Sequence, residues 1–154
     1  MSQRDKIRMT DDEVKAFLAA PRVMNIATNS PSGHPHLVAM WYGFDDDGNI
    51  VFETYKKSQK ILNLRRDEKM TALVEDGDNY MELKGVQIIG RGVIVEDPDY
   101  IHHVGRDVVR RYQPEFFQTD EQLDQLVTVM VAKRFAVRLE IDEIVSWDHA
   151  KLAG

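Results

Sequence analysis

The sequence predicts a mainly β protein with peripheral helices, built as an antiparallel barrel. About six apolar segments of strand length follow one another with turn signals between them, and the longer helical patterns come early or late in the chain. Gly85, Gly90 and Gly92 divide one long apolar segment, as glycines do where a strand bulges or bends. Strands in this order, with helices inserted late, fit an antiparallel barrel.

The expected strands are short segments rich in strand-forming residues. Segment 36–44 is aromatic-rich and apolar on both faces, so we expect it to be buried on both sides. Asp47-Gly48 separates it from segment 50–55, and this pair is a strong hairpin signal. Segment 135–141 alternates cleanly, as a half-buried strand does. The full set of expected strands is 23–30, 36–44, 50–55, 69–75, 81–96 and 135–141.

Residues that cap helices mark the expected helical segments. Capping boxes and an N-cap followed by proline satisfy the free amides of a first turn. The pairs that carry these signals are Thr10 with Glu13, Asp97 with Pro98, and Thr119 with Gln122. We therefore expect one domain over residues 1–154, with a short N-terminal helix 10–19 and a helical insertion of about 97–134 before the last strand.

Composition narrows the function classes. A chain of 154 residues buries a sufficient core without metal or disulfides, and the absence of cysteine excludes thiolate chemistry. A net charge of −6 argues against a general nucleic-acid binder. The N-terminal residues lack the apolar core of a signal peptide, and no stretch is long enough to cross a bilayer, so we expect a cytoplasmic protein without membrane contact.

A basic segment, 54–66, stands out against this acidic background. It holds five Lys or Arg and no Asp or Glu, and it reads as a strand end followed by a short helix with Ser58 as N-cap. Three lysines crowd the N-terminal end of that helix: Lys56, Lys57 and Lys60. The helix dipole disfavours a cation there by about a few tenths of a kcal/mol. A bound phosphate would explain this placement, because amides, hydroxyl and ammonium groups would converge on it. A solvated basic surface is the alternative, and the pattern alone leaves both open.

Other motifs give weaker signals. His102 and His103 diverge by about 100° in a helix and cannot chelate from one face. His34 lacks a nearby carboxylate or cysteine cluster, so no metal site is predicted. Trp41 and its neighbours could pack against a planar ring, although a core role is the more common one for a buried aromatic strand.

The order of segment 36–44, a hairpin, segment 50–55 and KKSQKILNLRRD resembles the flavin and deazaflavin oxidoreductases of the split β-barrel fold, the pyridoxamine-phosphate-oxidase-like superfamily. The resemblance extends from about Val23 to Leu152. Its most specific parts are S-x-K-x-x-N-L-R-R-D and the terminal SWDH-x-KL. This tail is similar to the branch that uses the deazaflavin coenzyme F420.

The resemblance implies an FMN-binding type of split barrel and a homodimer with two cofactor sites at its interface. By the same resemblance, the cofactor phosphate region would be bound by Ser58, Lys60 and Asn63, with Lys57 beside them. The tricyclic ring would be lined by His36, Val38, Met40 and Thr54. Tyr80 and Trp147 would reach the site, either within one chain or from its partner.

One departure narrows the expected activity. Pyridoxamine-phosphate oxidases end in an Arg-x-His motif that grips the substrate, whereas this chain has Trp147-Asp148-His149 without that arginine. Oxidation of vitamin B6 is therefore disfavoured. F420 carries a phosphodiester and a glutamate tail, so it needs more cations than FMN, and five basic residues within segment 54–66 fit the larger load.

We therefore expect an oxidoreductase that transfers a hydride between coenzyme F420 and a small electron-poor organic substrate. The alternatives are an FMN-dependent oxidoreductase or a non-enzymatic protein that binds a flavin, haem or tetrapyrrole. No residue is assigned as a catalytic acid, because His36, Tyr42 and solvent are all eligible from the sequence.

Overall fold

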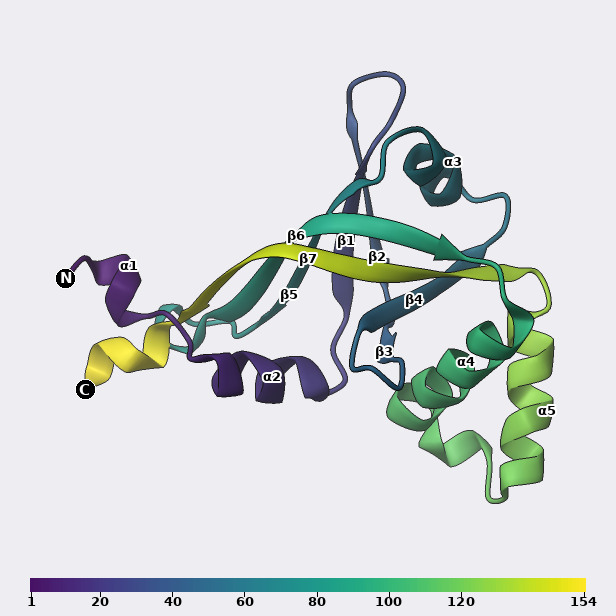
Figure 1. Ribbon diagram of the computed structural model, residues 1–154. Coiled ribbons are helices and arrows are strands. Elements are labelled where there is room, and N and C mark those ends of the chain that lie inside the picture. Colours follow the sequence, from purple (N-terminus) through teal and green to yellow (C-terminus); the bar gives the residue numbers. More distant parts are fainter.

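Seven antiparallel strands, in the order β2-β1-β5-β6-β7-β4-β3, form one sheet that curls into a half-barrel (Figure 1). The structure is a computed structural model that describes residues 1–154. The mainly β class predicted from the sequence is confirmed. The strands are β1 Met24–Asn29, β2 Pro35–Met40, β3 Gly43–Phe44, β4 Ile50–Tyr55, β5 Lys69–Asp76, β6 Lys84–Val95 and β7 Arg134–Asp148.

The helices lie around this sheet, and four of the five start at the predicted caps; α1, which starts with a capping box at Ser2, was not predicted. Ser58, Thr10 and Asp97 each accept a hydrogen bond from the first turn of their helix. None of the helices combines the length and apolar character needed to span a membrane. The helices are α1 Gln3–Lys6, α2 Asp11–Ala19, α3 Gln59–Arg66, α4 Pro98–Tyr112 and α5 Asp120–Val131, with short 3₁₀ turns η1 Tyr80–Glu82, η2 Pro114–Phe116 and η3 His149–Ala153.

The second predicted capping box, at α5, is only half formed. The Thr119 hydroxyl accepts from the Gln122 amide at 3.2 Å, as expected. The Gln122 side chain, however, accepts from the Gln118 amide at 2.7 Å rather than from that of Thr119. The Gln122 side chain thus satisfies the amide one residue before the N-cap, and the helix start is unchanged.

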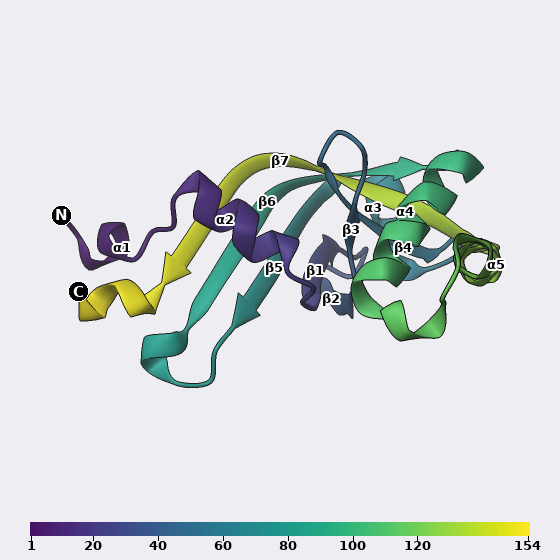
Figure 2. The same cartoon turned by 90° about the horizontal axis from the view of Figure 1, so that it is seen from below.

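The long strands β6 and β7 bend the sheet at a glycine. Their register shifts between Ile89 and Gly90, which is a β-bulge at a position where the sequence predicted one. A Cβ at Gly90 would lie 2.0 Å from the carbonyl oxygen of Glu140, so only glycine fits. Beyond the bulge, β5, β6 and β7 continue as a ribbon toward the two chain termini (Figure 2).

β4 is buried on both faces, which the sequence assigned to segment 36–44. Phe52 of β4 belongs to the main core inside the half-barrel, while Val51 packs against α4. The predicted strand 36–44 is instead split into β2 and β3, and its outer face is open: Leu37 is 67% and Trp41 43% exposed. The difference arises because β2 is an edge strand, whereas α4 covers β4.

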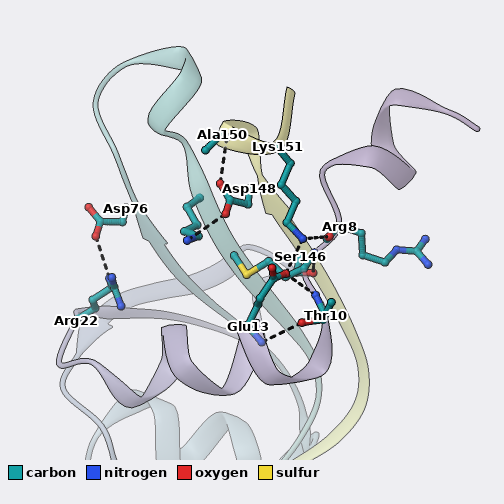
Figure 3. Close-up of polar contacts among 11 residues, drawn as sticks. Arg8, Thr10, Glu13, Arg22, Asp76, Ser146, Asp148, Ala150 and Lys151 are labelled. Carbon is teal, nitrogen blue, oxygen red and sulfur yellow. Dashed lines mark hydrogen bonds and ion pairs between the residues drawn. The ribbon is translucent and has the colours of Figure 1, made fainter. Parts of the chain in front are cut away.

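The last strand is longer than predicted, running to Asp148 rather than to Ile141. Pairing with β6 continues to its end, although its residues beyond Ile141 are half-buried or exposed and lose the apolar alternation. Its end is tied to the N-terminal segment (Figure 3): the Met9 amide donates to Ser146, and Lys151 contacts both the Arg8 carbonyl and Glu13.

Candidate functional site

The turn between β4 and α3 is pinned by hydroxyl groups. The Ser58 Oγ accepts from the Ile61 amide at 3.4 Å, and the Thr54 hydroxyl donates to the same oxygen at 3.2 Å. Two of the predicted site residues are therefore in contact, one on the strand and one at the helix start. Their arrangement holds the first turn of α3, with its free amides, against the end of β4.

Lys60 has a largely buried side chain and no ion-pair partner in the chain, although its ammonium nitrogen keeps some contact with solvent. The residue is only 9% exposed, and burial lowers the pKa of its ammonium group. A charged group removed from water is costly unless an opposite charge compensates for it. An anion at this turn would supply that compensation, which fits the phosphate predicted from the sequence. Lys57, beside it in the sequence, is exposed.

The other basic residues of this segment divide into two groups. Arg65 pairs with Glu96 at 2.6 Å, and Arg66 donates to the Asn29 carbonyl. Both arginines are therefore engaged away from the first turn of α3. Lys56 lies 5.2 Å from the centre of the Phe135 ring and makes no ion pair. Lys56, Lys57 and Lys60 thus remain available for an anionic ligand.

Asn63 ties α3 to the sheet. It is fully buried, its Nδ2 donates to the Thr28 hydroxyl at 3.0 Å, and its Oδ1 accepts from Gln59 at 2.8 Å. Because Asn63 is fully buried, these contacts fix the position of α3 against β1. Thr28, which the sequence analysis missed, is the connecting residue; its place on the inner face of an alternating strand was the only signal.

The predicted ring-lining residues of β2 share one face. His36, Val38 and Met40 lie directly across from Thr28, Ile26 and Met24 of β1, so their side chains point to the inner face of the sheet. All three are half-buried. The His36 Nδ1 is buried and has no hydrogen-bond partner. Thr28 lies opposite His36 and contacts Asn63, so the structure brings the β2 face and α3 together.

Tyr80 and Trp147 do not join this site within one chain. Phe135 pairs with Thr54, and at about 3.3 Å per residue Trp147 lies about 40 Å farther along β7. Its indole packs over Gly85, where a Cβ would be only 2.3 Å away. Tyr80 packs against His149, with ring centres 4.6 Å apart. The ribbon of β5, β6 and β7 ends near the two chain termini (Figure 2), and Trp147 pairs with Gly85 at that end.

A cavity of about 510 Å³ lies on the outer face of β4, the face opposite to Thr54. It is lined by Glu53, which was not among the predicted site residues. Glu53 is 4% exposed, and neither carboxyl oxygen has a hydrogen-bond partner. Burial raises its pKa to about 8, against the opposing charge of Arg134. One carboxylate in an otherwise apolar strand was a signal that could have found it. No group of three or more His, Asp or Glu is arranged to hold a metal ion.

Three solved structures with this fold carry names that describe different functions or none. Rv2991, a conserved hypothetical protein from Mycobacterium tuberculosis, is 44% identical with a TM-score of 0.91, and the match covers 100% of this chain and 94% of that one. An F420 reductase is 24% identical with a TM-score of 0.60, covering 84% and 94%. HutZ, the haem storage protein from Vibrio cholerae, is 13% identical with a TM-score of 0.65, covering 91% and 97%.

No curated protein is significantly similar to the sequence. The family model of pyridoxamine 5'-phosphate oxidase, by contrast, matches residues 10–148, which include every strand and every predicted site residue. The curled antiparallel sheet with its helix after β4 is the split barrel that the sequence resemblance implied. The chain therefore belongs to the pyridoxamine 5'-phosphate oxidase family, a split-barrel family of flavin-binding oxidoreductases and related proteins.

Proposed function

We propose that this protein is an oxidoreductase that uses coenzyme F420 and transfers a hydride between it and a small electron-poor organic molecule. The observation that carries the proposal is Lys60, which lies in the capped first turn of α3 with a largely buried side chain, an ammonium pKa lowered by burial, and no counter-ion. The bound deazaflavin supplies the hydride; the protein binds the cofactor, orients the substrate and excludes water.

The residues at the start of α3 and on the inner face of β2 fit such a cofactor. Ser58, Lys60 and Asn63 would hold the phosphate region, with Lys57 at the exposed side. The half-buried faces of His36, Val38 and Met40, together with Thr54, would line the ring, and the unpartnered His36 Nδ1 is free to hydrogen-bond to a polar edge. An F420 reductase with the same fold supports the choice, while FMN could use the same phosphate residues.

Two observations support a homodimer that completes the site. Leu37 of β2 is 67% exposed, and Trp41, just after the strand and stacked on Tyr112, is 43% exposed; a second copy would cover this apolar surface. Tyr80 and Trp147 lie too far from α3 in their own chain, so only a partner could bring them to the site. Light scattering at micromolar concentration should give about twice the chain mass. A monomer that binds cofactor stoichiometrically would contradict the shared site.

Titration of the purified protein with F420 and with FMN, followed by ring fluorescence, tests the proposal directly. We expect tighter binding of F420, and faster oxidation of the reduced cofactor when an electron-poor acceptor is added. Tight binding without accelerated oxidation would identify a carrier. Preference for FMN would change the cofactor and leave the oxidoreductase assignment in place.

A further inference from the structure

The cavity on the outer face of β4 lies along the free edge of β2. It touches Ala39, Met40 and Trp41, which are consecutive. Neighbouring residues of an extended chain point to opposite sides, so a cavity that reaches all three follows the edge of the strand. β2 is the last strand of the sheet, which leaves this edge unpaired. Met40 also belongs to the proposed ring-lining face, so the cavity adjoins the cofactor site.

Two polar side chains on the cavity wall lack partners. Both carboxyl oxygens of Glu53 and the Nε of Arg134 are buried without a hydrogen bond. Glu53 lies beside Gly105 of α4: a Cβ there would lie 3.3 Å from its Oε1, and closer still to the side chains of Val127 and Val131, at 2.8 and 3.0 Å. The Arg134 guanidinium stacks over Tyr55, with its central carbon 4.8 Å from the ring centre, and makes no ion pair. Buried groups of this kind are normally satisfied.

The cavity favours the neutral form of Glu53. Its other walls come from Ala39 and Met40 of β2 and from residues outside it, none of which titrates, and Arg134 is the one charged group that faces Glu53. Those further wall residues are Val23, Trp41, Val108, Gln113 and Met130. Burial holds the pKa of Glu53 at about 8, despite the arginine. At neutral pH the wall therefore presents a carboxylic acid proton and a guanidinium, both of them donors.

We propose that this cavity is the substrate pocket, and that Glu53 and Arg134 together anchor the carboxylate of a flat, mainly apolar, conjugated molecule. As a substrate pocket it rests on the oxidoreductase function proposed above. The ligand's negative charge would compensate Arg134, one of its oxygens would accept the Glu53 proton, and its apolar body would lie against Trp41, Met40 and Met130. The volume of about 510 Å³ is in the usual range for small-molecule sites.

Cinnamate, a conjugated aromatic carboxylate, is a suitable probe, and calorimetric titration of the cofactor-free protein measures its binding. Wild type should bind it at pH 6.5 and about tenfold more weakly at pH 9, because only about a tenth of Glu53 then keeps its proton. Cinnamyl alcohol, which lacks the carboxylate, should bind more weakly and without this pH dependence. Quenching of tryptophan fluorescence in Trp147→Phe, which leaves Trp41 as the one tryptophan, gives a second readout inside the pocket.

Two substitutions separate the anchors. Glu53→Gln keeps a neutral hydrogen-bond donor, so cinnamate should bind with similar affinity at both pH values. Arg134→Met should weaken binding by roughly tenfold or more at both, the usual range for a hydrogen bond to a charged group; Arg134→Lys should weaken it less. Glu75→Gln, on an exposed position of β5, is the matched control and should behave as wild type.

The possible results show separately whether the pocket proposal or the proposed oxidoreductase function fails. A tenfold pH effect that persists in Glu53→Gln, wild-type affinity in Arg134→Met, or no cinnamate binding by wild type would each overturn the pocket. Binding of F420 without cinnamate removes the pocket alone. Cinnamate binding without F420 or FMN binding removes the oxidoreductase function and leaves the pocket standing.

Discussion

At each of the two faces of β4 lies an ionisable side chain that lacks a partner. On the inner face, Thr54 and Ser58 hold a helix start at which the buried Lys60 lacks an anion. On the outer face, one residue earlier, Glu53 is buried without a donor and is driven toward its neutral form. An ammonium group only donates hydrogen bonds, so its face selects an anion or another acceptor. A carboxyl group can keep its proton and become a donor, so the same strand offers two different kinds of site.

Apolar residues on the inner face of β4 should contribute more to the free energy of unfolding than those on its outer face. Phe52 is fully buried in the main core, and Phe52→Ala should lower the free energy of unfolding by about 3–5 kcal/mol. Val51→Ala, on the α4 side, removes less surface and should cost roughly 2 kcal/mol. Urea unfolding measures both. Equal losses would show that the α4 interface matters as much as the half-barrel core.

Replacing the carboxyl group on the outer face should change how stability depends on pH. The folded pKa of Glu53 is raised, so its contribution is fully present below the unfolded pKa and is lost as pH rises toward about 8. Glu53→Gln abolishes that loss, and its advantage over wild type should grow to on the order of 2 kcal/mol or more between pH 5 and 8. Chemical denaturation at several pH values measures this; Glu75→Gln should not reproduce it.

Removing the cation on the inner face should weaken cofactor binding. Lys60→Ala should cost about 1.5–3 kcal/mol, the range for a hydrogen bond to a charged group. Added phosphate should compete with the cofactor in wild type and much less in the variant. Fluorescence titration measures the affinity, with Lys69→Ala, an exposed lysine at the start of β5, as the control. Wild-type affinity in Lys60→Ala would place the phosphate elsewhere.

The smallest effect is expected from the exposed rim of the inner face. Lys57 is available for the acidic tail of F420, whereas Arg65 is paired with Glu96. Such surface contacts contribute about 0–1 kcal/mol each and fade with salt. Lys57→Glu should therefore reduce the preference for F420 over FMN at low salt, and reduce it less for F420 stripped of its glutamates. A preference for FMN at low salt, unaffected by Lys57→Glu, would overturn the choice of cofactor.

The features that the sequence predicted correctly depend mostly on a few neighbouring residues. Helix starts at Thr10, Ser58 and Asp97, the hairpin at Gly48 with its positive φ of 81°, and the bend at Gly90 all depend on a few neighbouring residues, so they could be read without the fold. The sequence resemblance supplied the split barrel. The cluster of lysines marked the α3 turn because a charge pattern against a helix dipole is itself local.

Only the tertiary structure decided what covers each strand and which residues lack partners. β2 and β4 read alike as apolar strands, but one is an edge and the other lies beneath α4, which depends on pairing between distant segments. The long reach of β7 placed Trp147 away from α3 because strand length is set by pairing with β6. Whether Glu53 and Lys60 are satisfied is likewise a property of packing, since a charge is costly only when the chain around it excludes water.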